Sequence, residues 1–556
     1  MCSLSTSNAQ PQSSAGSGRS GQNFITGAAI LGVAGVLVKI ISACFKIPLT
    51  NIVGSDAMLY FTNAYTIYTA LINISAAGLS VAVAKCISEY VALGRYRDVK
   101  SVTRAANLTF VIIGLICSVV FFVFAEDISL LISGTTKSAP ACMAMAPAIL
   151  FVSVQSVYKG YAQGYSDMTS SAIGNILEVV IKLIFGLGGA YLLLNMGFDM
   201  PIVMAGAVGG VSFGSFVSMS YLIISKKVMK RRYDRLYPTT ELTPAQAPFL
   251  SVMKKFIWIA FPITIGSLAS NLGSTVDLAI VQRRLLELPG ATTKMVEEWY
   301  GAYSSMAYTV FQMPYTIILS IGISVLPAVS AAFAVKHQER LQTTVNTAVK
   351  LCSLVAMPCA FGMMALSGPI LDLLFSDEKG IAIATPLLAY LGAAFFFMCC
   401  AAIFSPLLQA VGRASIPVIN TAIAIGVKIL CNYILVAIPE IGINGAAISN
   451  IVLYVVLFAL NLIALRRITK VRTDIKSVYI KPLIGGALCG LTAWCVYALL
   501  GDRLGNSIAT VVAIGLAAIV YFAFILFSKT IKKDDVEFLP KAKKIEKILE
   551  KRNWIG

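Results

Sequence analysis

Residues 27–49, GAAILGVAGVLVKIISACFKIPL, decide how the rest of the chain is interpreted. Gly27 to Val38 are almost all apolar, and the apolar character continues past Lys39 and Lys46. A helix needs about 20 predominantly apolar residues to cross a bilayer. The stretch therefore predicts a transmembrane helix with two ammonium groups, seven residues apart on one face. Because a charge in a membrane span is costly, both lysines are candidate functional residues.

The whole chain has the same apolar character. Its 556 residues are 58% hydrophobic and only 13% charged, with a mean hydropathy of +0.82, whereas soluble domains are about 25% charged. Because lipid offers no hydrogen bonds to the backbone, the spans must be helical. The composition predicts an all-α polytopic membrane protein with 14 transmembrane helices. The apolar runs cover residues 24–46, 57–84, 105–125, 141–162, 171–194, 202–225, 256–281, 301–333, 346–368, 381–411, 415–437, 442–465, 479–500 and 507–528.

Cations gather in every second loop between these runs, and the intervening loops are neutral or acidic. The cations of the basic loops are Arg95, Arg97, Lys100, Arg104, Lys159, Lys226, Lys227, Lys230, Arg231, Arg232, Arg235, Lys336, Arg340, Arg413, Arg466, Arg467, Lys470 and Arg472. Short cytoplasmic loops collect Lys and Arg, so a multi-pass protein of the cell membrane with both termini cytoplasmic is predicted. The net charge of +18 reflects this topology. No basic domain is visible, which argues against a nucleic-acid partner.

The sequence carries no recognisable enzyme constellation. There are twelve cysteines, mostly isolated in apolar runs, and His337 is the single histidine, so no metal site or other cofactor is expected. The phosphate-binding loop of ATPases, the HExxH metalloprotease motif and a Ser/His/Asp set are all missing from the sequence. Any active transport must therefore be driven by Na⁺ or H⁺ coupling, the membrane potential or the substrate gradient.

Two copies of a six-helix unit are predicted. QGYSDMTSSAIGNILEVVIKL, from Gln163, matches QAVGRASIPVINTAIAIGVKIL, from Gln409, and GLSVAVAK (78–85) matches GISVLPAV (322–329) at nearly the same shift. An even number of spans gives both pseudo-symmetric bundles one orientation, with a substrate site between them. The expected parts are a disordered cytoplasmic tail (1–23), a first bundle (24–225), a basic linker (226–255), a second bundle (256–465), two extra C-terminal helices (466–528) and a basic amphipathic tail (529–556).

Six cations are predicted to line a hydrated cavity that binds an anionic substrate. They are Lys39, Lys46, Lys182, Arg283, Arg284 and Lys428. The internal repeat places VDLAIVQRRL (276–285) over the segment with Lys39 and Lys46, and Lys182 over Lys428. Lys46 precedes Pro48 near the end of its span, so its ammonium either snorkels to the interface or faces the cavity.

Two intramembrane acids, Asp277 and Glu178, are candidates for ion coupling or gating. Asp277 either forms a structural ion pair with Lys39 across the two halves or acts as a Na⁺ or H⁺ site or gate. Glu178 lies one turn before Lys182, so these two side chains are predicted to neutralise each other. Lys428 has Ala424 at the matching position, which leaves it without such a partner.

The opening of the chain is similar to a known family. The segment LVKIISACFKIPLTNIVGSDAMLYFTNAYTIYTALINISAAGLSVAVAKCISEYVALGRYRDV, residues 37–99, resembles the stage V sporulation protein B family, a relative of MurJ-type lipid II flippases. Both belong to the multidrug/oligosaccharidyl-lipid/polysaccharide exporter superfamily. VDLAIVQRRL resembles the family's later Asp-then-Arg-Leu stretch. The chain departs from the pattern at Lys46, where arginine is common, and at the Gly54-Ser55-Asp56-Ala57 turn.

The resemblance implies a V-shaped pair of bundles that opens to each side of the membrane in turn. The cationic cavity would take the diphosphate-sugar headgroup of an undecaprenyl-linked precursor, first of all lipid II, and the last two spans would hold its lipid tail. The implied partners are this lipid-linked oligosaccharide diphosphate, membrane lipids and cell-wall synthases. An ion-coupled exporter of drugs or other small molecules is the main alternative and needs an acidic cavity. A non-transporting scaffold for cell-wall synthases is the third hypothesis.

Overall fold

The protein is all-α in a computed structural model that describes residues 17–92, 96–165, 167–236, 254, 275–315, 318, 319, 329, 330, 332, 333, 335, 337–413, 415–471 and 474–530. The first half contains α1 (Ser17–Ile72), the π-helical turn η1 (Asn73–Ala77), α2 (Gly78–Ala92), α3 (Tyr96–Val123), α4 (Ala125–Ser133), α5 (Ala139–Gly164), α6 (Met168–Asn195) and α7 (Met200–Leu236). The second half contains α9 (Thr293–Gly301), η3 (Ala302–Ala307), α10 (Tyr308–Gln312), α12 (Gln338–Ala365), α13 (Ser367–Leu374), α14 (Glu378–Ala410), α15 (Ser415–Leu435), α16 (Asn444–Thr469), η4 (Lys476–Ile480), α17 (Lys481–Leu504) and α18 (Asn506–Phe527).

Eleven helices in the described residues are long and apolar enough to cross a membrane, which confirms a multi-pass membrane protein. The predicted runs 24–46 and 57–84 share one of them, Ile30–Ile72, which consists of two helices joined by a kink at Gly54, in the turn expected between the runs. Most of the predicted run 256–281 lies outside the described residues, and the run 301–333 is described only in part. The prediction of fourteen spans therefore stands untested over these segments.

The long helix α1 is broken at Gly54. The apolar part of α1, Ile30–Ile72, has 43 residues, and at 1.5 Å per residue it is about 64 Å long, roughly twice the thickness of a bilayer core. Gly54 has φ of 83° and ψ of 165°, a conformation that residues with a Cβ rarely adopt. Pro48 lies inside the helix just before the break and removes one backbone donor. The two halves of α1 can therefore take different directions.

Several predicted segment boundaries differ in the structure. Helix α1 begins at Ser17, so residues 17–23 of the predicted tail are helical, and residues 1–16 lie outside the described part. Helix α7 continues to Leu236, into the predicted linker, of which residues 237–253 and 255 are not described. Only residues 529 and 530 of the predicted C-terminal tail are described.

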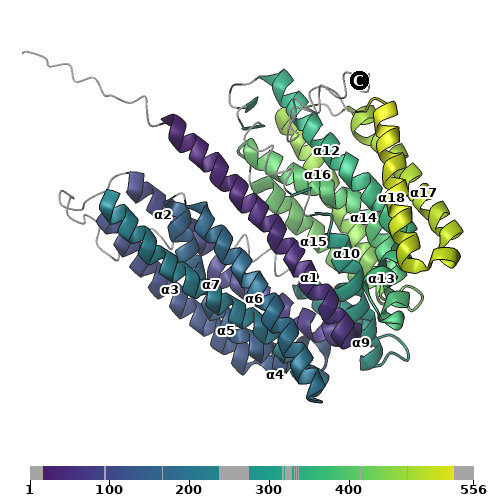
Figure 1. The fold of residues 1–556 in the computed structure, drawn as a ribbon, viewed down its shortest axis with the longest axis horizontal. Coiled ribbons are helices and arrows are strands. Elements are labelled where there is room, and N and C mark those ends of the chain that lie inside the picture. The colour runs from purple at the N-terminus through teal and green to yellow at the C-terminus, as the bar shows by residue number, and fades with distance from the viewer. Residues whose placement is uncertain are drawn as a thin grey trace, which may run out of the picture.

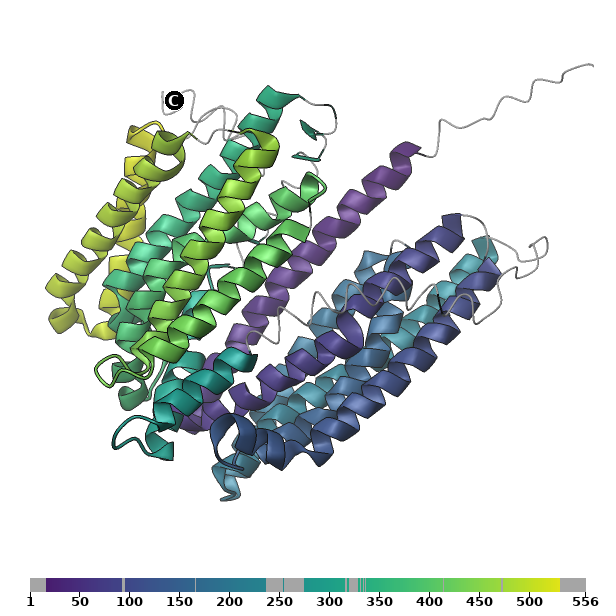
Figure 2. The same cartoon turned by 180° about the vertical axis from the view of Figure 1, so that it is seen from behind.

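The helices form two lobes, with α1 between them (Figures 1 and 2). The first lobe consists of α2–α7, and the second of α9–α16, with α17 and α18 on its outer side. The lobes diverge where α1 and α12 begin and α7 and α16 end. We call this the basic end, because α7 and α16 finish there with Lys226, Lys227, Arg466 and Arg467. At the opposite, convergent end, α1 packs on α9 and η3 as well as on α5, α6 and α7.

Polar contacts join α1 to the second lobe at the convergent end. The Ser55 hydroxyl donates to Asp377 Oδ2 at 2.5 Å, and the Ser55 amide donates to the same oxygen at 3.2 Å. Asn51 donates to the carbonyl of Leu374 at 3.0 Å and accepts from the amide of Ser376 at 3.1 Å. Gly301 permits the closest approach, since a Cβ there would lie 2.0 Å from the carbonyl oxygen of Ser55. This set of contacts holds α1 against the second lobe at the convergent end.

Candidate functional site

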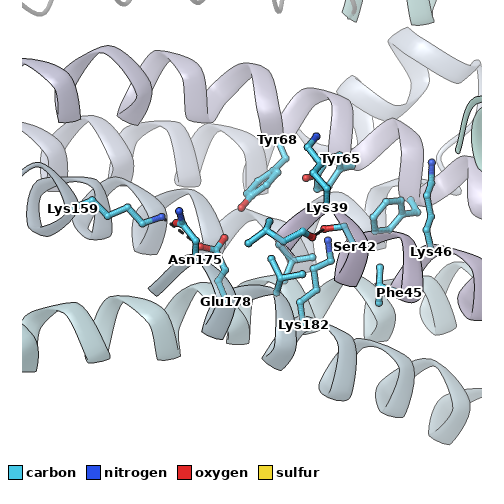
Figure 3. A pocket seen from close by; sticks show the side chains of 14 residues that line it. Lys39, Ser42, Phe45, Lys46, Tyr65, Tyr68, Lys159, Asn175, Glu178 and Lys182 are labelled. Atoms are coloured by element: carbon cyan, nitrogen blue, oxygen red, sulfur yellow. Dashed lines mark hydrogen bonds and ion pairs between the residues drawn. The ribbon is translucent and has the colours of Figure 1, made fainter. Parts of the chain in front are cut away.

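A polar pocket of about 420 Å³ lies against the first half of α1 (Figure 3), within the usual volume range of small-molecule sites. Its lining residues come from α1, α5, α6 and α7: Val38, Lys39, Ser42, Phe45, Lys46, Phe61, Tyr65, Tyr68, Lys159, Asn175, Glu178, Val179, Lys182 and Val211. Four lysines face one glutamate. The pocket is therefore strongly cationic. It brings together three of the six predicted cations, Lys39, Lys46 and Lys182, but its lining belongs to α1 and the first lobe, whereas the sequence analysis expected the site between the two bundles.

Small residues on α7 fix the backbone of α6 at this pocket. A Cβ on Gly214 would lie 2.5 Å from the carbonyl oxygen of Glu178, and one on Gly210 would lie 2.4 Å from the amide nitrogen of Gly186. The two helices are thus in backbone contact over the segment that carries Glu178 and Lys182. Because α6 cannot move closer to α7, this contact fixes the position of the backbone from which both side chains project.

Lys182 is the most enclosed lysine of the pocket, with 9% of its surface exposed. Its ammonium lies 4.9 Å from the ring centre of Phe45 and 5.6 Å from that of Tyr65, both on α1. Cation–π attraction of this kind offsets part of the cost of burying the charge. An anion that enters the pocket meets a cation that has aromatic neighbours but no ion pair among the described residues.

Glu178 is held by side chains of α5 and α7 rather than by Lys182. The amide nitrogen Nε2 of Gln155 donates to Glu178 Oε2 at 2.9 Å, and the Lys159 ammonium lies 3.7 Å from the same oxygen. The prediction that Glu178 pairs with Lys182 is wrong, because the carboxylate turns toward α5 and α7, where Ser215 also donates at 3.5 Å. Sequence reasoning assigned Lys159 to the basic loops. Helix α5 continues to Gly164, and this length places Lys159 inside the pocket.

Lys46 connects the pocket to the second lobe. Its ammonium donates to the carbonyl of Ser304 in η3 at 2.8 Å. A π-helical turn alters the ordinary i to i−4 pairing, so its carbonyls are open to other donors. In Figure 3 Lys46 lies at the opposite end of the pocket from Lys159. Lys46 therefore lines the pocket and also contributes to the contact between the lobes.

The remaining predicted cations lie outside this pocket. Arg283 donates to the carbonyl of Leu131 at 2.6 and 3.0 Å, next to α4. Arg284 pairs with Glu287 and stacks 3.5 Å over the ring of Tyr433. Both guanidinium groups are thus engaged at the convergent end of the molecule, where α4 and α9 lie.

Asp277 forms its ion pair with Lys428, so the prediction of a pair with Lys39 is wrong. The Lys428 ammonium lies 2.8 Å from Asp277 Oδ2, and Asn432 donates to Oδ1. Lys428 and Asn432 are one turn apart on α15, so both reach the same carboxylate. The prediction that Lys428 has no acidic partner fails for the same reason. Both charged side chains are only 13% exposed.

A second, apolar pocket of about 540 Å³ lies between α17, α18 and the second lobe. Its walls come mainly from α12, α13, α17 and α18 and include Leu354, Pro358, Gly362, Cys489, Ala493, Ala517 and Phe522. The packing of α17 on α12 and of α18 on α13 forms it. Almost no polar surface is available there, so the pocket suits hydrocarbon.

Two helical lobes, a central helix between them and a cationic pocket define a membrane transporter. A family model described as Lipid II flippase MurJ matches residues 136–501, and one described as MatE matches residues 31–187. The chain belongs to the MurJ family, whose members are transporters rather than enzymes.

Known proteins with similar sequences point the same way. Stage V sporulation protein B of Bacillus subtilis (strain 168) is 22% identical over 520 residues, which covers 93% of this chain and 98% of that protein. Lipid II flippase MurJ of the same organism is 21% identical and covers 80% of this chain and 82% of its own length.

Solved structures share the fold. A Lipid II flippase MurJ structure in an inward closed conformation superimposes with a TM-score of 0.65 at 17% identity, over 91% of this chain and 98% of that one. An inward-facing multidrug resistance MATE transporter superimposes with a TM-score of 0.59 at 15% identity, over 80% of this chain and 99% of that one.

Proposed function

We propose that the protein is a flippase that moves an undecaprenyl-diphosphate-linked cell-wall or polysaccharide precursor, first of all lipid II, across the cytoplasmic membrane by alternating access. The observation that carries this proposal is the pocket with four lysines and one glutamate. Cations in a low-dielectric site attract the two negative charges of a diphosphate diester strongly. Phe45, Phe61, Tyr65 and Tyr68 add ring faces against which a sugar can pack.

The apolar pocket supports the same substrate class. A polyprenyl chain needs a dry surface that continues from the membrane, and the space between α17, α18, α12 and α13 offers one. In the predicted organisation these two helices follow the second six-helix unit. We infer that the headgroup binds beside α1 and that the tail lies along the second lobe.

The proposed orientation places the basic end in the cytoplasm. This follows from the positive-inside rule, and it puts both termini on the cytoplasmic side. The lobes diverge at the basic end and are bonded together at the convergent end (Figure 1). In this orientation the diverging ends of the lobes face the side where lipid-linked precursors are made, and transport requires the bonds at the convergent end to break.

Reconstitution in liposomes tests this proposal. Labelled lipid II is placed in one leaflet, and its appearance in the other leaflet is measured with and without the protein. A zwitterionic phospholipid with the same label serves as the control lipid. We expect rapid movement of lipid II alone. Movement of neither lipid, together with transport of an organic cation, would instead support the drug-exporter alternative.

A further inference from the structure

Glu178 places a negative charge inside the pocket that is proposed to bind an anion. Its carboxylate lines the same space as Lys39, Lys46, Lys159 and Lys182. It is the acid of that lining, and its side chain is 24% exposed, so an incoming headgroup meets it directly. Like charges in a site of low dielectric repel strongly. An anion and an ionised Glu178 therefore compete for the same lysines.

In the part of the chain that the structure describes, the groups that face Glu178 are all cationic or neutral. Helix α1 contributes Lys39, Lys46, Tyr65 and Tyr68, helix α5 contributes Lys159 and Gln155, and Lys182 follows on α6 itself. Helix α7 contributes only the neutral hydroxyls of Ser215 and Ser218 near this point. In the empty pocket, Lys159 and Gln155 hold the ionised carboxylate, which thus occupies the place of an anion.

Gln155 can support the protonated form as well. Its side chain is fully buried between Glu178 and Ser218, and its Nε2 donates to both. Its Oε1 is buried and has no hydrogen-bond partner among the described residues. A rotation of the amide brings this oxygen toward Glu178, where it can accept a hydrogen bond from a neutral carboxyl group. Gln155 can therefore form a hydrogen bond with Glu178 whether the carboxyl group is ionised or protonated.

Asp277, the second intramembrane acid identified from the sequence, does not compete with an anion in this way. Asp277 is bonded to Lys428 and Asn432 and lies outside the lysine pocket. Its partner Lys428 does not line the lysine pocket, so an anion that enters the pocket does not compete with Asp277 for this cation. Glu178 differs because its ion pair is long, at 3.7 Å, and involves a lysine of the binding pocket.

We propose that Glu178 is a built-in competitor of the substrate, so that binding of the anionic headgroup is linked to uptake of one proton from water by the Glu178 carboxylate. Protonation removes the competing charge and releases Lys159 for the headgroup. Release of the headgroup on the far side returns the proton, and the carboxylate again holds Lys159. The inference rests on the proposed function and adds its regulation by pH. Because linkage is reciprocal, tighter anion binding at lower pH requires proton uptake on binding.

The test uses the full chain in detergent and UDP-N-acetylglucosamine, a soluble diphosphate diester whose two phosphates stay ionised through the neutral range. Affinity is measured by calorimetry at about pH 6 and about pH 8, where ordinary carboxylates are ionised and only shifted ones titrate. We expect the wild-type protein to bind several-fold more tightly at the lower pH. Proton release or uptake is measured in the same experiment by comparing two buffers of different ionisation heat.

Glu178→Gln removes the competing charge and keeps a partner for Gln155. We expect this variant to bind the probe roughly tenfold more tightly at the higher pH, with little pH dependence and no proton uptake. Glu126→Gln alters an exposed glutamate on α4 outside the pocket and should behave like wild type. Glu178→Asp retains the charge and should retain the pH dependence.

The outcomes separate this inference from the proposed function. If the wild-type protein binds the probe but Glu178→Gln shows the same affinity and pH dependence, or binds more weakly, the competitor role is wrong and the anion site remains. If neither protein binds the probe and the lipid II assay is also negative, the proposed function fails. Proton uptake by the wild-type protein tests the inference even if the Glu178→Gln variant does not fold.

Discussion

Lys182 has the most constrained environment of the four lysines in the pocket. It projects from the part of α6 that contacts α7 through Gly214, and its ammonium lies over two aromatic rings. Lys39, by contrast, is exposed on α1. A fixed charge loses less entropy than a mobile one when it binds a ligand. Lys182 is therefore expected to contribute most to the binding of an anion.

Lys182→Met tests this expectation. Methionine keeps the apolar contacts with Phe45 and Tyr65 but removes the charge, and a hydrogen bond to a charged group contributes about 1.5–3 kcal/mol. We expect affinity for the diphosphate probe to fall on the order of tenfold to a hundredfold, with a parallel loss of lipid II movement. Lys227→Met, on the exposed surface of α7, is the matched control. Equal affinity of both variants would contradict a direct role of Lys182.

Asp277 and Lys428 form a pair whose loss can be tested on stability. Lys428→Met leaves a largely enclosed carboxylate without its cation, and removal of one partner from a buried pair costs on the order of 3 kcal/mol. We expect a clearly lower unfolding temperature in detergent. The double variant Lys428→Met with Asp277→Asn should recover most of the loss. If Lys428→Met were as stable as wild type, the ion pair would have no structural importance.

The same residues show what the sequence could and could not predict about the site. The sequence alone identifies Lys39, Lys46 and Lys182 as candidate site residues, because a charged residue within an apolar run can be recognised without knowing how the helices pack. The sequence does not identify Lys159 as a pocket residue, since a lysine near the end of an apolar run is typical of a basic loop. The partners of Asp277 and Glu178 depend on how each helix is rotated about its axis, and the sequence contains no direct signal for that rotation.

At the scale of elements, the break in α1 and its contact with the end of α9 determine how α1 packs against the second lobe. Gly54 ends the first direction of α1 with a positive φ, and Ser55 then lies against Gly301. The sequence predicted a turn near Gly54 and two separate spans. The kink at Gly54 confirms this turn, and the two helices of α1 follow each other there without a longer loop.

Gly301→Ala tests this contact between elements. The added Cβ would lie 2.0 Å from the carbonyl oxygen of Ser55, so α1 and α9 must move apart, and such overpacking costs about 1–3 kcal/mol. We expect faster amide hydrogen exchange in residues 49–60 and 297–305, where the lobes then separate more often. Gly362→Ala, on α12 with open space around its Cβ, is the control. Unchanged exchange in Gly301→Ala would show that this contact does not limit opening.

At the scale of the whole molecule, the two ends of the lobes have different chemistry. The pocket with its lysines and Glu178 is lined by α1 and the first lobe, whereas the convergent end combines the hydrogen bonds of Ser55 and Asn51 with ion pairs such as Lys137–Glu297. Lys46 contacts both regions, since it lines the pocket and bonds to Ser304. An anion that draws Lys46 away from Ser304 would weaken the convergent end. Substrate binding and opening are thereby connected through one side chain.

Asp377 is expected to hold the convergent end without sensing pH in the neutral range. Partial burial opposes its ionisation, but hydrogen bonds from the Ser55 hydroxyl and from the amides of Gly380, Ser55 and Lys379 outweigh burial and lower its pKa. A lowered pKa in the folded state stabilises the contact above the ordinary pKa of aspartate. That contribution is lost only as the pH falls below about 4.

Asp377→Asn and Glu178→Gln should therefore have separable effects on transport. Asp377→Asn weakens the bonds to Ser55, so we expect the rate of lipid II movement to change by the same factor at about pH 6 and about pH 8, where wild-type Asp377 stays ionised. Glu178→Gln should instead abolish the difference between the two pH values. The measurement is the ratio of flipping rates at the two pH values in liposomes. A changed ratio in Asp377→Asn would mean that the pH response arises at the convergent end rather than in the lysine pocket.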